Sequence, residues 1–176
     1  MIYDGIQHIK LAKLPSPEKL WELQTEGFNH LVNVSGIDLF QLYGAEGLRS
    51  FTVKQYSFKD VFSKSPQLGG GIIDFAEIGE HAYIAASTVE DRQSFYWAVI
   101  DVLENLKTQT PMFVFCHQGI GRSPCVLFAA LAQWYEANYS QVFKVIKFLN
   151  AHAVITCLSY SAVKWFAEEF NRQSTP

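Results

Sequence analysis

The sequence predicts an α/β fold, a single domain over residues 1–176 with a mainly parallel central sheet of about four to five strands flanked by helices. Short apolar runs alternate along the chain with longer runs of helical periodicity, which is typical of parallel strands joined by helices. A chain of 176 residues is long enough to form one domain with a full core. Because 49% of the residues are hydrophobic and 15% aromatic, the composition excludes a disordered chain.

The first half of the chain has strand patterns around one helix with clear end signals. Residues 5–12 alternate well enough to predict a first strand. Ser16 and Pro17 predict the N-cap and first residue of a helix that runs to Glu26 and ends at Gly27. The elements expected next are strands over 30–34 and 51–58, a helical fragment over 39–43, a loop over 63–71 and short strands over 72–75 and 81–86.

The second half reads mainly as helix. Residues 87–107 repeat apolar side chains at helical spacing, and the apolar run 112–116 predicts a buried strand. Residues 121–137 are apolar nearly all round, so we expect a central, buried helix there. Two amphipathic stretches, 139–151 and 159–171, predict helices that cover it.

One stretch organises the chain, Val114 to Pro124, with the sequence V-F-C-H-Q-G-I-G-R-S-P. A strand, a loop with glycines and a helix start follow one another here, and this arrangement points loop amides and the positive end of a helix dipole at one spot. The dipoles favour the thiolate form of Cys116, and Arg122 offers a planar fork suited to two phosphate oxygens. The stretch therefore predicts a phosphate site with a sulfur nucleophile beneath it; the alternative is a buried Cys before an ordinary βα turn.

The residues Cys116 to Ser123, C-H-Q-G-I-G-R-S, resemble the C-x-x-G-x-x-R-[ST] signature of cysteine-dependent protein tyrosine phosphatases. The Ser-Pro ending and the short chain are most similar to the dual-specificity branch. Residues 13–35 also resemble that family's N-terminal helix and its hLVNVS strand, and the two helical stretches after the loop fit its C-terminal half. The resemblance implies a protein tyrosine phosphatase-like fold and a phosphatase that uses neither metal nor cofactor.

In this interpretation Cys116 attacks phosphorus and Arg122 binds two non-bridging oxygens more strongly as charge grows on them. The Ser123 hydroxyl donates to the departing thiolate or, alternatively, only caps the helix; both roles can coexist. The phosphate-binding amides are those of six consecutive loop residues: His117, Gln118, Gly119, Ile120, Gly121 and Arg122.

The family supplies a leaving-group proton from an Asp on a separate loop upstream of the Cys. By position, the resemblance implies Asp91, which has Glu90 beside it. The alternative is that both acids belong to capping boxes begun by Ser87 and Thr88. Asp74, which follows three glycines, is the second candidate.

The chain departs from the family pattern directly before the nucleophile, where Phe115 stands in place of the usual His. A phenyl ring forms no hydrogen bond that could brace the loop. The loop also has no Lys, which argues against an inositide phosphatase. Cys125 and Cys157 are candidates for a protective disulfide with Cys116 or are plain structural thiols.

The expected substrate is a phosphorylated protein or a small phosphate monoester. The group expected to be hydrolysed is phosphotyrosine, with phosphoserine and phosphothreonine as further possibilities. A non-catalytic phosphate-binding module without an effective acid is the alternative, and a sulfurtransferase is a third possibility that fits the spacing less well. A net charge of −3 without a basic cluster argues against nucleic acid, and no apolar run is long enough to cross a membrane. With three cysteines and no signal-peptide pattern, we expect a cytoplasmic monomer.

Overall fold

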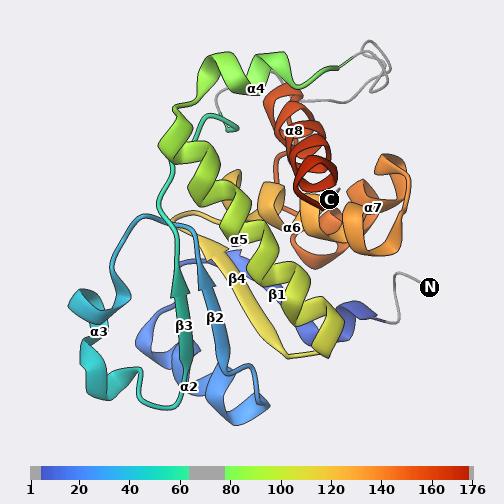
Figure 1. Ribbon diagram of the computed structural model, residues 1–176. Helices are drawn as coiled ribbons and strands as arrows, with labels where there is room; N and C mark the ends of the chain where they lie inside the picture. Colours follow the sequence, from blue (N-terminus) through green and yellow to red (C-terminus); the bar gives the residue numbers. More distant parts are fainter. Residues whose placement is uncertain (1–4, 64–77, 175–176) are drawn as a thin grey trace.

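The computed structural model describes residues 5–63 and 78–174, and a four-stranded, all-parallel sheet lies at its centre (Figure 1). The strand order is β1-β4-β2-β3. The strands are β1 (Ile9–Lys13), β2 (His30–Asn33), β3 (Thr52–Gln55) and β4 (Met112–Cys116). The predicted fold class, with its mainly parallel sheet between helices, is confirmed.

Helices connect and cover the strands. After the short 3-10 turn η1 (Ile6–His8), they are α2 (Pro17–Glu26), α3 (Leu39–Gly47), α4 (His81–Ala86), α5 (Val89–Thr108), α6 (Arg122–Tyr135), α7 (Tyr139–Leu149) and α8 (Cys157–Ser174). The predicted ends of α2 are confirmed: Ser16 Oγ accepts a hydrogen bond from the Lys19 amide, and Gly27 has a left-handed φ of 86°.

Different helices cover the two faces of the sheet. Since side chains alternate along each strand, neighbouring strand residues pack against different helices. On β4, Phe113 and Phe115 pack with leucines of α2 and α3. Val114 and Cys116 lie in the larger core, which α5 to α8 build on the other face (Figure 1). This parity matters for the site, since Cys116 and the residue before it face opposite layers.

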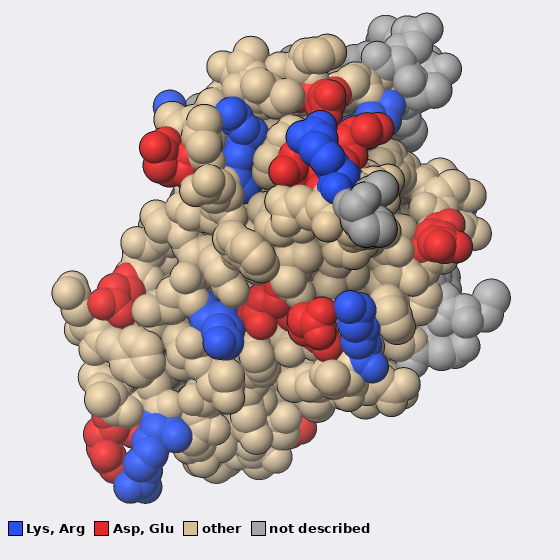
Figure 2. Space-filling model, in the orientation of Figure 1, with Lys and Arg blue, Asp and Glu red and all other residues tan. Residues whose placement is uncertain are grey.

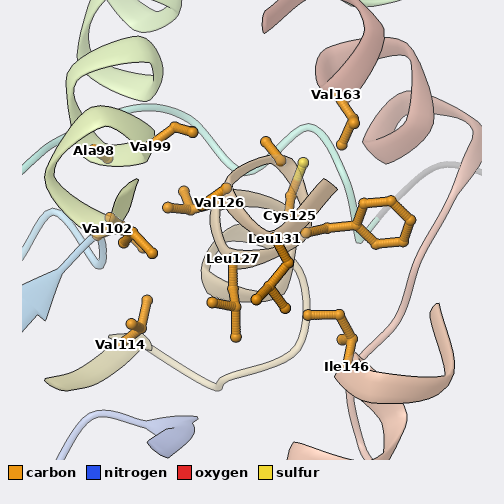
Figure 3. Packing of buried hydrophobic residues seen from close by; sticks show 14 of the residues in the cluster. Ala98, Val99, Val102, Val114, Cys125, Val126, Leu127, Leu131, Ile146 and Val163 are labelled. Carbon is orange, nitrogen blue, oxygen red and sulfur yellow. The ribbon is translucent and has the colours of Figure 1, made fainter. Parts of the chain in front are cut away.

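Helix α6 is the centre of the larger core, as its nearly all-round apolar pattern predicts. Residues Val126, Leu127 and Leu131 are fully buried. Figure 3 shows them surrounded by side chains of α5, β4, α7 and α8, such as Val102, Val114, Ile146 and Val163. The helix that follows the Cys116 loop is therefore fixed from several sides.

Some local predictions are corrected by the structure. Residues 81–86, expected as a strand, form α4; three of the six are alanine, and the segment packs on α8, where the Tyr83 amide donates to Ser161 Oγ at 2.8 Å. The first strand begins at Ile9, after η1, rather than at Gly5. The strand predicted over 72–75 and nearly all of the loop predicted over 63–71 lie outside the described residues.

Acidic and basic side chains are interspersed on the face formed by α5 and α8, with no gathering of one sign (Figure 2). Among the described residues, no helix is both long and apolar enough to cross a membrane.

We predict that Leu127→Ala lowers the free energy of unfolding by about 2–5 kcal/mol, because it removes fully buried methyl groups from the centre of the core. Urea unfolding measures the change. Leu42→Ala in α3, where the side chain is 49% exposed, is the control and should change stability by no more than about 0.5 kcal/mol. Equal losses in the two variants would contradict the central position of α6.

Candidate active site

Cys116 ends the central strand β4 at the edge of the sheet where the carboxyl ends of the parallel strands meet. Cys116 is 2% exposed. The hydroxyl of Ser123, in the first turn of α6, donates to Cys116 Sγ over 3.2 Å. A hydroxyl in this position stabilises negative charge on the sulfur, so the predicted contact between these two residues is present.

The loop between Cys116 and Arg122 has its carbonyls turned outward. The carbonyl of His117 accepts from the Leu14 amide at 3.2 Å, that of Gly119 from Asn150 Nδ2 at 2.9 Å, and that of Ile120 from the Val154 amide at 2.8 Å. Across residues 5–63 and 78–174, no protein group accepts a hydrogen bond from the amides of residues 117–121. Those amides are therefore available to an anion.

Two loop glycines lie close to neighbouring segments, and at Gly119 the neighbour is backbone. Gly119 has a φ of 73°, and a Cβ there would lie 2.7 Å from the backbone carbon of Ala12. At Gly121 a Cβ would lie 3.0 Å from Asp60 Oδ1. Gly121 is also the N-cap of α6 and provides no side-chain cap, so the helix N-terminus keeps free amides directed toward the loop.

Arg122 is anchored at one nitrogen and unpaired at another. Its Nη1 donates to the carbonyl of Ser35 at 2.8 Å, just beyond the end of β2. Its Nε is buried and has no hydrogen-bond partner in the described structure. A buried, unpaired guanidinium N–H costs free energy unless a ligand accepts from it.

A cavity of about 230 Å³ brings these groups together. Asp60 and Ser63 form part of its wall. The other lining residues are six that were predicted from the sequence: Cys116, His117, Gln118, Ile120, Gly121 and Arg122. The arrangement is a small cavity with a thiol, a guanidinium and loop amides around it, which are groups suited to an anion.

No protein-family model and no curated protein matches this sequence, whereas solved structures match its fold over nearly the whole length. Human DUSP28 aligns with a TM-score of 0.59 at 16% identity, covering 95% of this chain and 96% of that chain. PTPMT1 aligns with a TM-score of 0.63 at 16% identity, covering 96% of each chain. The human tyrosine phosphatase-like serine/threonine/tyrosine-interacting protein aligns with a TM-score of 0.62 at 13% identity, covering 97% of this chain and 96% of that chain.

The chain has a dual-specificity phosphatase-like fold.

Within this phosphatase-like fold, Asp60 is the one acidic side chain among the described residues that line the cavity, and the sequence pattern did not predict it. It follows β3 by five residues, and its carboxylate accepts from the amides of Phe62 and Ser63 at 3.0 and 3.1 Å. Ser63 Oγ donates to Asp60 Oδ2 at 2.6 Å. The signal was present in the sequence, because a loop that follows a parallel strand lies at the same edge as the Cys116 loop.

Asp91, by contrast, lies in the first turn of α5, where its amide donates to Thr88 Oγ1 at 3.1 Å. This is the helix-capping arrangement that the sequence offered as the alternative. Asp91 is not among the described residues that line the cavity, and its role as an acid stays a prediction. Asp74 lies outside the described residues.

Phe115 occupies the position before the nucleophile and faces away from the cavity layer. Its ring is fully buried and stacks on Phe113, with 5.1 Å between ring centroids. The loop is instead held by hydrogen bonds to its carbonyls, which Leu14, Asn150 and Val154 donate.

The two other cysteines are free thiols. Cys125 is fully buried in α6, and burial, with a smaller contribution from the negative charge of Asp60, raises the pKa of its thiol well above the usual value. Its Sγ lies 3.6 Å from the carbonyl of Ser159, as expected for a structural thiol. Cys157 is half-buried at the start of α8.

We predict that Gly119→Ala destabilises the fold and weakens binding of tungstate, a phosphate mimic, because the new Cβ meets the Ala12 backbone. Gly27→Ala is the matched control, since Gly27 also has a positive φ of 86° but has no atom within 4 Å of a Cβ. The control should lose only about 1–2 kcal/mol of unfolding free energy and keep its affinity for tungstate. Urea unfolding and calorimetric titration measure both quantities; equal effects in both variants would show that the close approach at Gly119 is unimportant.

Proposed function

We propose that this protein is a cysteine-dependent phosphatase that hydrolyses phosphate monoesters through a cysteinyl-phosphate intermediate. The supporting observation is the convergence on one cavity of Cys116, Arg122 with its unpaired Nε, and a loop whose amides have no acceptor among the described residues. An ester dianion satisfies all of these donors at once and places phosphorus next to the sulfur.

In the first step Cys116 Sγ attacks phosphorus in line, the S–P bond forms and the P–O bond to the leaving group breaks. Arg122 and the loop amides bind the non-bridging oxygens, on which charge is redistributed in the transition state. The leaving oxygen takes a proton from an acid. We assign the role of acid to Asp60, because its carboxylate lies next to Gly121 in the wall of the cavity.

In the second step water attacks the cysteinyl phosphate, and the S–P bond breaks to release inorganic phosphate. The departing thiolate is stabilised by the hydroxyl of Ser123, which already donates to Sγ over 3.2 Å. The deprotonated Asp60 then accepts a proton from the attacking water, so that the acid of the first step is the base of the second.

A second function, a phosphate-binding module without turnover, is favoured by one observation. Both carboxylate oxygens of Asp60 are engaged within their own turn, by two amides and by Ser63 Oγ. Proton donation requires the Ser63 contact to Oδ2 to open. If it stays closed, the site binds a phosphoryl group without hydrolysing it; the similarity to a protein described as tyrosine phosphatase-like and interacting agrees with this alternative.

The proposed substrate is phosphotyrosine, with phosphoserine and phosphothreonine as further substrates, carried by a protein or a small molecule. PTPMT1 has been seen in complex with PI(5)P, and an inositide is therefore the competing class. Between Cys116 and Arg122 this chain has no Lys that could neutralise additional phosphates, which favours singly phosphorylated esters.

We predict that Cys116→Ser abolishes hydrolysis of aryl phosphates but retains tungstate binding within about tenfold, because Arg122 and the loop amides remain in place. Release of the phenol and calorimetric titration measure the two properties. Appreciable turnover by this variant would contradict the assignment of the nucleophile.

We predict that Asp60→Asn lowers kcat by about 10²–10⁴ for alkyl phosphates and much less for activated phenyl phosphates, which leave without a proton. The alkaline limb of the pH–rate profile should disappear as well. Asn keeps the Oδ1 acceptor for the two turn amides, so the loop should stay folded. Asp91→Asn is the matched control, and it should leave the leaving-group dependence unchanged. A large leaving-group effect in Asp91→Asn instead would return the acid role to Asp91; an effect in neither variant, with slow wild-type turnover, would favour the binding module.

A further inference from the structure

A buried hydrogen-bond network at the end of β2 surrounds Asn33, which is 1% exposed. Asn33 Oδ1 accepts from the Ser35 amide at 2.9 Å and from the Ser35 hydroxyl at 2.6 Å. Asn33 Nδ2 donates to the Ile37 carbonyl at 2.7 Å and to Gln55 Oε1 at 2.9 Å. The side-chain amide of Asn33 is thus satisfied on both sides and fixes the turn that follows the strand.

This turn carries the carbonyl that holds Arg122. Ser35 O accepts from Arg122 Nη1 at 2.8 Å, and the next residue, Gly36, has a positive φ of 80°. The Ser35 hydroxyl also accepts from the Ile37 amide at 3.0 Å, so the peptide is held before and after the carbonyl. Few rotations remain that could move this acceptor.

We propose that Asn33 is a positioning residue for oxyanion binding, which acts through Ser35 to orient the guanidinium of Arg122. Arginine has a long side chain with many rotamers, and a fixed contact at Nη1 restricts the directions in which the rest of the planar fork can point. With Nη1 engaged at Ser35, the N–H of Nε and the N–H groups of Nη2 are the donors left for the ligand. The proposal depends on the phosphate site proposed above, and it assigns part of that site's affinity to a residue outside the cavity wall.

The test compares Asn33→Ala with Asn105→Ala. Asn105 is a second buried asparagine, and its Nδ2 contacts Met112 Sδ at 3.6 Å, at the opposite end of β4 from Cys116. Calorimetric titration with tungstate should give a Kd about tenfold higher in Asn33→Ala and unchanged in Asn105→Ala, although both substitutions lower stability. An unchanged Kd in Asn33→Ala, or an equal rise in both variants, would overturn the proposal.

A double-mutant cycle with Arg122→Ala identifies the route. If Asn33 acts through Arg122, Asn33→Ala should raise the Kd for tungstate far less in the Arg122→Ala background than in the wild type. The thermal shift at high tungstate concentration measures the Kd in the weakly binding variants. The same cycle measured by urea unfolding needs no ligand, and here the two substitutions should be non-additive. Simple additivity in both measurements would mean that Asn33 and Arg122 act independently.

Ser35→Ala provides a milder variant, because it removes only the hydroxyl and keeps the amide contact to Asn33 and the carbonyl that binds Arg122. If Asn33→Ala does not fold, Ser35→Ala should still show a smaller rise in Kd for tungstate, and no rise would overturn the proposal. Tungstate binding without any hydrolysis by the wild type would reject catalysis but leave the role of Asn33 intact. Hydrolysis with normal tungstate binding in every variant would reject only the positioning role.

Discussion

The site depends on one constraint, the direction in which the peptides between Cys116 and Arg122 face. A loop can present its amides to an anion only if its carbonyls are satisfied elsewhere. Here the segments after β1 and after α7 supply the donors for those carbonyls, through Leu14, Asn150 and Val154. The contacts come from regions far apart in the sequence, so the cradle exists only when the whole domain is folded.

The parallel sheet explains why the remaining groups arrive at the same place. All four strands end at one edge, and the loops after them bring Arg122's anchor from the end of β2 and Asp60 from beyond β3. The site is therefore a property of strand order as much as of the loop motif. A chain with little sequence identity to DUSP28 or PTPMT1 can share their fold because the core requires general apolar patterning rather than particular residues.

Local chemistry made much of this predictable from the sequence. Ser16, Pro17 and Gly27 determine the ends of α2 through a side-chain cap, a fixed φ and a left-handed φ, all of which act within a few residues. The Cys116 loop was predictable for the same reason. Residues 81–86 were misread because packing on α8 decides their conformation, and Asp60 was missed because its place at the cavity depends on strand order.

The two halves of the proposed machinery are held very differently. The proposed oxyanion cradle is fixed by buried contacts. Asn33 accepts a hydrogen bond from Ser35, the Ser35 carbonyl accepts one from Arg122, and α6 is packed in the core. The proposed acid, Asp60, lies on a loop, and among the described residues its carboxylate accepts hydrogen bonds only within its own turn. In the proposed function, binding of a phosphoryl group therefore rests on groups fixed by the core, whereas turnover would depend on whether Ser63 Oγ releases one oxygen of Asp60. A single hydrogen bond on this loop can accordingly separate an enzyme from a binding module on the same fold, without any change to the cradle that both need.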